Sequence, residues 1–383
     1  MFRGTVRAEM LGKSSAQPQD NQPTSESQLA GYASIKAEPK KPFKIVDTKQ
    51  TILKDGVKRI SIWYGPFTIR GRNSTSPPSA YQSMDKYGTA WQYIAEDIPR
   101  DITVLKSNVS VVYADGSPAD VSNGIYQHHS YLTAATKQLP KWSTCGVAPK
   151  MIAEYYSPGS LFVGGAEDKF GGYFTTPTGD LNSGYYIGKE DKLILNGDVV
   201  NYTPNDKVVY SVNEIEYIPG KPADLMAASM YIMVPGQCAG DQVAISSKGK
   251  GERFTVSGPP QTVTKDATIL NFRGHLHDGG DTMAVKINDK TVCTSEAKYG
   301  FAAAFSGTGG MKKRVVADPG PHGDATSQTI LEMSQCFNIP LKKGDTYALE
   351  AVYDTKKHPT RKMHDGGEGE MMALGVAFIA LKE

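Results

Sequence analysis

The sequence predicts an all-β protein with two domains. Glycine (39 residues), proline (23) and tyrosine (20) are abundant, and short runs rich in Val, Ile, Thr and Tyr recur between turn residues. Such runs are typical of strands, because β-branched and aromatic side chains fit a pleated, half-buried surface. The chain has 383 residues, a length that favours two domains, each able to bury a core of its own.

The first part of the chain differs in composition from the rest. Residues 1–45 are rich in Gln, Ser, Pro and Lys, which predicts an arm without a core of its own. From residue 46 onward strand patterns dominate, and 59–63 alternates polar and apolar residues. Strands are expected at 59–63, 102–105, 109–113, 126–132, 192–202 and 208–218. One helix is possible around 89–97.

The clearest break in the middle of the chain is Pro219-Gly220-Lys221-Pro222. Because domain boundaries fall in Pro- and Gly-rich linkers, we place the boundary here. The first domain would span 46–219 and the second 220–383. Further strands are expected at 229–234, 267–277, 283–287, 347–353 and 374–381.

Charge and hydropathy exclude several classes of partner. The 42 basic and 40 acidic residues are spread along the chain, so we expect no nucleic-acid partner. No run approaches the roughly 18 apolar residues of a membrane span. Residues 1–21 contain no apolar signal-peptide core, yet three Asn-x-Ser/Thr sequons weakly favour secretion: Asn73, Asn108 and Asn201. The protein would be secreted or in the secretory pathway if a signal peptide was removed, and cytoplasmic otherwise.

The four cysteines are Cys145, Cys238, Cys293 and Cys336, and none has the close CxxC spacing of a zinc site. An even number permits disulfides, and four cysteines allow three pairings. The alternative is four buried thiols in a cytosolic protein.

Six of the seven histidines fall into three groups, namely His128-His129, His275 with His277, and His358 with His364. The HxH pair is the most informative. Side chains at i and i+2 of a strand point to the same face, so His275 and His277 can chelate one metal ion. The alternative is an exposed polar face.

The other two candidates depend on their surroundings. Adjacent residues of a regular strand face opposite ways, so His128 and His129 reach one metal ion only if a bulge distorts the backbone. Otherwise one points inward and one is solvated. Met371 opens an apolar strand after a Gly-rich loop. Its thioether is a soft ligand that suits Cu(I), and the alternative is a core residue.

Three motifs occur in an order that resembles a known family: 125–129 (IYQHH), 273–277 (RGHLH) and 364–371 (HDGGEGEM). They are similar to those of the copper- and ascorbate-dependent monooxygenases, which include peptidylglycine α-hydroxylating monooxygenase and dopamine β-monooxygenase. The resemblance runs discontinuously over 120–383. It implies two jelly-roll-like antiparallel β-sandwich domains whose copper sites face each other across a solvent gap. One copper would be held by the HH pair and a third histidine, the other by the HxH pair and Met371.

The sequence also departs from that family. No histidine lies between His129 and His275, so the third ligand of the first copper is missing. Asn201 aligns near its place, with Asp198 as a nearby alternative. An oxygen donor disfavours Cu(I), so this copper is either weakly held or lost. The resemblance assigns Arg273 to a substrate carboxylate, which an arginine fork can bind with two bonds. A structural salt bridge is the alternative.

The resemblance implies a copper-dependent monooxygenase that oxidises or hydroxylates a C–H bond of a small organic substrate. It would use O2, one or two copper ions, and ascorbate or another one-electron donor. The family's partners of the substrate-binding arginine correspond to Ala373 and Gly375, so we do not expect C-terminal glycine peptides as substrates. The alternative is a non-redox enzyme, such as a cyclase or isomerase, or a copper-binding protein without turnover. The sequence indicates neither the substrate nor the oligomeric state.

Overall fold

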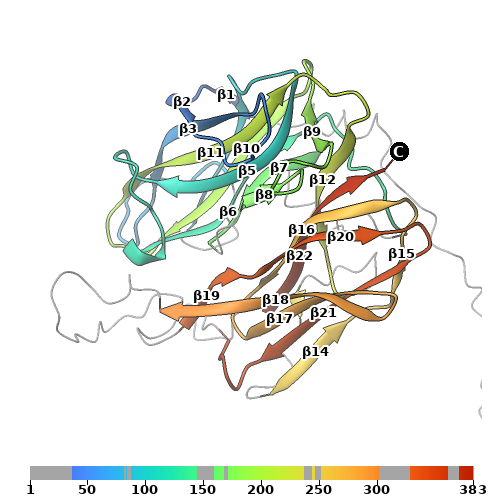
Figure 1. Cartoon of the computed structure of the whole chain (residues 1–383). Coiled ribbons are helices and arrows are strands. Elements are labelled where there is room, and N and C mark those ends of the chain that lie inside the picture. Colours follow the sequence, from blue (N-terminus) through green and yellow to red (C-terminus); the bar gives the residue numbers. More distant parts are fainter. Residues whose placement is uncertain are drawn as a thin grey trace, which may run out of the picture.

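Strands make up most of the computed structural model, which describes residues 37–81, 83, 88–144, 159–167, 171–236, 244–245, 252–301, 328–360 and 371–382. Within these ranges one short 3-10 turn, η1 (Val121–Asn123), is the single helical element. No helix of the described residues is long and apolar enough to cross a membrane. The predicted all-β class is confirmed, and the described strands form three sheets (Figure 1).

The smallest sheet has five strands in the order β1-β4-β10-β6-β7. Its strands are β1 (Glu38–Lys40), β4 (Gly88–Ala95), β6 (Ile125–Ala134), β7 (Ser160–Gly165) and β10 (Leu193–Asn201). The central strand β10 runs antiparallel to both β4 and β6, and all nine of its residues are buried. It is therefore the fully buried centre of the sheet.

An eleven-stranded sheet extends through the whole molecule in the order β2-β3-β11-β5-β9-β12-β22-β16-β20, with β8 beside β5 and β13 beside β22. Its strands are β2 (Lys44–Thr48), β3 (Lys58–Ile69), β5 (Ile102–Val112), β8 (Gly171–Tyr173), β9 (Ser183–Ile187), β11 (Lys207–Pro219), β12 (Met226–Met233), β13 (Ala244–Ile245), β16 (Ala267–Leu276), β20 (Gln335–Leu341) and β22 (Met371–Leu381). The parallel pairing of β9 with β12 joins the strands before residue 220 to those after it.

The third sheet has six strands in the order β14-β21-β17-β18-β19, with β15 beside β21. Its strands are β14 (Arg253–Ser257), β15 (Gln261–Thr262), β17 (Gly280–Ile287), β18 (Lys290–Phe301), β19 (Gln328–Met333) and β21 (Thr346–Asp354). A disulfide between Cys293 and Cys336 links β18 of this sheet to β20 of the long sheet. Cys145 and Cys238 lie outside the described residues.

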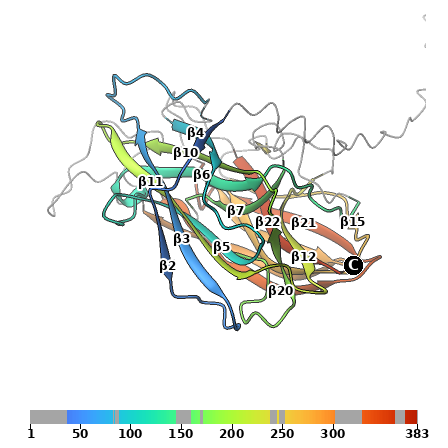
Figure 2. The same ribbon diagram turned by 90° about the horizontal axis from the view of Figure 1, so that it is seen from above.

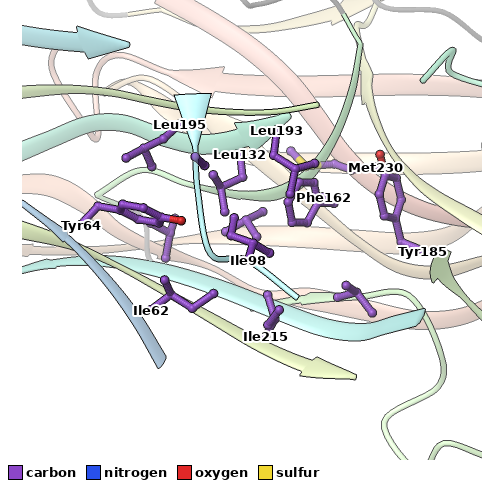
Figure 3. Close-up of a cluster of buried hydrophobic side chains, with 14 of the residues drawn as sticks. Ile62, Tyr64, Ile98, Leu132, Phe162, Tyr185, Leu193, Leu195, Ile215 and Met230 are labelled. Atoms are coloured by element: carbon purple, nitrogen blue, oxygen red, sulfur yellow. The ribbon is translucent and has the colours of Figure 1, made fainter. Parts of the chain in front are cut away.

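The sheets enclose two main hydrophobic cores. One lies between the five-stranded sheet and the first half of the long sheet, and the other between the six-stranded sheet and the second half (Figures 1 and 2). We call the described residues up to 219 the first lobe and those from 220 the second lobe. Figure 3 shows Met230 of β12 near Phe162 of β7 in the first core. A second-lobe strand thus contributes to the first-lobe core.

Strand β22 contributes side chains to both cores, because its side chains alternate between the two faces of the sheet. Phe378 and Val376 belong to the first core, and the ring centroid of Phe378 is 5.0 Å from that of Phe174. Met371 and Ala373 belong to the second core. The two lobes are therefore joined by a continuous sheet and by shared apolar packing.

The structure differs from the sequence predictions at several places. The prediction of a possible helix around 89–97 is wrong, because Gly88–Ala95 forms strand β4. Within this strand Trp91 stacks on Phe67 with ring centroids 4.3 Å apart. A single strand, β5 (Ile102–Val112), replaces the two strands predicted at 102–105 and 109–113. Strand β1 and the start of β2 lie in the range 1–45 and pair with β4 and β3, and the arm itself stays a prediction. The expected domain boundary at 219 falls between β11 and β12, and the division into domains stays a prediction.

Candidate metal centre

A β-bulge distorts strand β6 at its two adjacent histidines. Strand β10 pairs Asp198 with His129 and the next residue, Val199, with Gln127. His128 is therefore the extra residue of the bulge. Two adjacent histidines need such a distortion if both are to point to one place.

The bulge brings His128 and His129 to Asp198. One potential ligand atom from each of the three side chains lies within 4.8 Å of the other two, and His128 Nδ1 is 3.5 Å from Asp198 Oδ2. In the described part of the chain, no other group of three or more His, Cys, Asp or Glu side chains gathers its ligand atoms this closely. We call these three residues the HHD cluster.

The protonation states of His129 and Asp198 suit metal binding. Burial, followed by the nearby His128, lowers the pKa of His129 to about 4, so its imidazole is neutral near pH 7. Burial opposes ionisation of Asp198, yet its interactions with His128 and His129 and a hydrogen bond from Ser83 Oγ (2.7 Å) hold its pKa below the usual value. Neutral imidazole and ionised carboxylate are the forms that bind a metal ion.

Asn201, the residue expected as the third ligand, shapes the turn after β10. Its Nδ2 donates to the carbonyl oxygens of Ile69 (3.3 Å) and Asn205 (2.9 Å). Its Oδ1 accepts from the amide (3.0 Å) and the hydroxyl (2.7 Å) of Thr203. These four bonds use the hydrogen-bonding capacity of the amide in the turn. It is Asp198 that the structure brings to the two histidines.

The HxH pair lies on β16 and at its end, on the face directed toward the first lobe. Leu276 packs in the second core, so alternation directs His275 and His277 to the opposite face. Their ring centroids are 5.9 Å apart. Both line a small, open pocket whose empty space is about 330 Å³ with the adjoining open solvent included, together with Tyr126, Glu167, Leu276, Asp278, Thr329 and Ile330. Because Tyr126 and Glu167 come from the first lobe, we call it the interlobe pocket.

The HxH pair lies close enough to the HHD cluster to affect it across the lobes. The charge of a protonated His275 contributes to the lowered pKa of His129. The rings of Tyr126 and His128 have centroids 5.9 Å apart, so the lining of the interlobe pocket reaches the HHD cluster. Both groups therefore face the region between the lobes.

The two methionines at the start of β22 point to opposite faces. Met371, the expected thioether ligand, is 1% exposed and packs in the second core with Leu276 and Ala373. The amide of His277 donates to the carbonyl oxygen of Met372 at 3.1 Å, so these two residues are opposite each other in the ladder. Opposed residues in antiparallel strands share a face. Met372 is thus on the face of the two imidazoles, and Met371 on the other.

Two buried carboxylates also line the interlobe pocket. Asp278 accepts hydrogen bonds from the hydroxyl of Thr329 (3.0 Å) and the amide of Ile330 (3.2 Å). Glu167 is 6% exposed and accepts from the amide of Gln127 at 3.3 Å. Glu167 lies in a glycine-rich segment without a ligand motif, so the sequence alone does not predict its place in the pocket.

The remaining predicted residues lie elsewhere or outside the described residues. The side chain of Arg273 is 2% exposed and is not among the described residues that line the interlobe pocket. His358 stacks on Tyr299 with ring centroids 3.6 Å apart. His364 lies outside the described residues.

No family model matches the chain. It is 23% identical over 283 residues to a probable copper-dependent oxygenase of Phoma sp., and 23% identical over 277 residues to one of Cochliobolus lunatus. These matches cover 73% and 71% of this chain. The chain is a distant relative of both proteins. The match spans 63% of the Phoma protein, less than two thirds of its length, and 77% of the Cochliobolus protein.

Among solved structures, a recombinant peptide:N-glycanase F matches with a TM-score of 0.35 and 11% identity, over 86% of this chain and 96% of its own. The glycosylasparaginase PNGase F of Flavobacterium meningosepticum matches with a TM-score of 0.32 and 11% identity, over 83% and 96%.

Proposed function

We propose that this protein is a copper-dependent oxygenase whose copper ion is bound by His275 and His277 at the interlobe pocket. Two observations support this proposal. Its distant relatives are named probable copper-dependent oxygenases. Two imidazoles from one strand face line a single pocket between the lobes, and this observation carries the proposal.

The donor set fits copper. Imidazole nitrogen suits copper in both oxidation states, and a thioether favours the reduced ion. The expected thioether is that of Met371, but the ladder between β16 and β22 favours its neighbour Met372, which shares the face of the imidazoles. When bound, copper would supply the one-electron chemistry that activation of O2 requires.

The reaction we propose is the oxidation of a C–H bond of a small organic substrate. One oxygen atom of O2 would enter the substrate and the other would leave as water. The two electrons needed would come from ascorbate or another one-electron donor. The interlobe pocket would hold the substrate, and Tyr126 on the first lobe would face it across from His275.

The chain's own side chains would define what the pocket accepts. The carboxylates of Glu167 and Asp278 line it, whereas the guanidinium of Arg273 is buried away from its described lining. Such a lining favours neutral or cationic groups that donate hydrogen bonds. It disfavours a substrate carboxylate. This agrees with the sequence, in which Ala373 and Gly375 stand where the resembled family has the partners of its substrate-binding arginine.

The test measures copper content and O2 consumption on the purified chain. We expect copper to bind and O2 to be consumed when ascorbate and a substrate are present. Replacing both imidazoles (His275→Ala with His277→Ala) should abolish O2 consumption. His358→Ala is the matched control, because this histidine stacks on Tyr299 and is not among the described residues that line the pocket. Copper binding without O2 consumption would instead favour a copper-binding protein.

A further inference from the structure

We infer that the HHD cluster is a separate site for a divalent transition-metal ion, and that it holds Cu(II) in preference to Cu(I). This inference goes beyond the proposed oxygenase, because it requires neither O2 nor a substrate. All three donors come from the first lobe, His128 and His129 from β6 and Asp198 from β10. Their potential ligand atoms already lie within 4.8 Å of one another.

The chemistry of the donors sets the preference for oxidation state. Two imidazole nitrogens and one carboxylate oxygen form a set without sulfur. A carboxylate is a hard, anionic ligand that stabilises a divalent ion more than a monovalent one, whereas Cu(I) prefers soft donors. Among divalent first-row ions, sites of this kind bind Cu(II) more tightly than Zn(II). Because Asp198 stands in the cluster where the resembled family has a third histidine, the site favours Cu(II) over Cu(I).

The carboxylate is held in position before any ion arrives. Ser83 Oγ donates to Asp198 Oδ1 at 2.7 Å and leaves Oδ2 directed at His128 Nδ1, 3.5 Å away. Gly88 leaves room for this arrangement, because a Cβ there would lie 2.7 Å from Asp198 Oδ1 and 1.8 Å from Ser83 Oγ, so that one of these side chains would have to shift. A partner that orients a ligating carboxylate typically contributes about 10- to 100-fold in metal affinity.

The bulge likewise places the two imidazoles in position before an ion binds. In a regular strand His128 and His129 would diverge, but the register shift opposite Asp198 and Val199 brings both to one carboxylate. The ring centroids of the two histidines are 5.2 Å apart. The backbone has thus made the rearrangement that shared coordination requires.

The experiment uses the full chain with His275→Ala and His277→Ala, so that the HHD cluster is studied without the HxH pair. Cu(II), Zn(II) and Cu(I) are each titrated against a competing chelator in metal-free protein. We expect one Cu(II) per chain, bound more tightly than Zn(II), and weaker binding of Cu(I). Electron paramagnetic resonance of the Cu(II) form should show coupling to two nitrogens, and to one nitrogen after His129→Ala.

Two substitutions at one position separate the roles of charge and donor type. Asp198→Asn should weaken Cu(II) binding by about tenfold or more, because it removes the anionic ligand. Asp198→His supplies a third imidazole and should raise Cu(I) affinity. Asp206→Asn is the matched control, since this first-lobe carboxylate accepts from Gly71 and Ser76 away from the cluster. Circular dichroism of the metal-free variants checks that each is folded.

The outcomes decide between binding and structural roles. If Asp198 variants do not fold, Ser83→Ala replaces them, with an expected loss in Cu(II) affinity of about tenfold. An unchanged Cu(II) affinity in both Asp198→Asn and Ser83→Ala, or tighter binding of Cu(I) than of Cu(II) by the unmodified cluster, would overturn the inference. Neither result depends on whether the interlobe pocket supports oxygenation.

Discussion

His128 Nδ1 and Asp198 Oδ2 lie 3.5 Å apart, across a bulge in which strand β10 has no residue to oppose His128. The two residues are distant in sequence and come from antiparallel strands, so their approach depends on the register of β6 against β10. A shift of that register by one residue would turn Asp198 to the other face of the sheet. The pairing of β6 with β10 therefore determines whether the first lobe has three donors or two.

The acid stability of the metal-free protein should depend on His129. Its pKa in the folded state is lowered to about 4, below the value of 6.5 for an unperturbed histidine. Between these values the unfolded state binds more protons, so the folded state loses stability as the pH falls from about 6.5 to about 4. We expect the melting temperature to fall over this window, and His129→Asn to reduce the fall. An equal fall in both proteins would contradict the lowered pKa.

The two adjacent methionines of β22 should behave differently. Met372→Leu removes the thioether on the imidazole face and should weaken Cu(I) binding at the HxH pair by about tenfold. Met371→Leu conserves volume in the second core and should cost less than about 1.5 kcal/mol of stability without changing Cu(I) affinity. A chelator competition titration with Cu(I) measures both. If Met371→Leu alone weakens binding, the residue expected from the sequence is the ligand.

The disulfide between β18 and β20 should contribute to stability. Cys293 and Cys336 are 43 residues apart, and their link restrains the unfolded chain. The double substitution Cys293→Ser with Cys336→Ser should lower the free energy of unfolding by about 2–4 kcal/mol. Guanidinium denaturation followed by circular dichroism measures this loss. An unfolding free energy equal to that of the unmodified chain would show that the link adds nothing.

The two lobes should unfold together, because they share the first core. Phe378 is 1% exposed on a second-lobe strand and packs against Phe174 of the first lobe. Phe378→Ala should cost about 3–5 kcal/mol and lower one common transition in scanning calorimetry. The matched control is Phe43→Ala, because Phe43 is 56% exposed, contacts Tyr210 within the first lobe, and should cost about 1 kcal/mol. Two separate transitions in the unmodified protein would contradict a shared core.

Short-range patterns explain which features the sequence predicts well. The strands around 59–63, 208–218 and 267–277 follow from β-branched and aromatic runs between turn residues, and the structure contains each of them. The segment 89–97 forms a strand and not the expected helix, because its pairing with β10 and the stacking of Trp91 on Phe67 decide its conformation. Long-range pairing overrides local preference in such a segment.

The sequence by itself determined the all-β class and the shared face of His275 and His277. It also determined that His128 and His129 need a bulge to meet. These conclusions rest on the period of two along a strand, which is a local property of the chain. Only the tertiary structure decided that Asp198 joins the two histidines, that Glu167 faces the HxH pair, and that Met372 rather than Met371 shares its face. Each of these depends on the register between strands distant in sequence, which packing of the whole molecule selects.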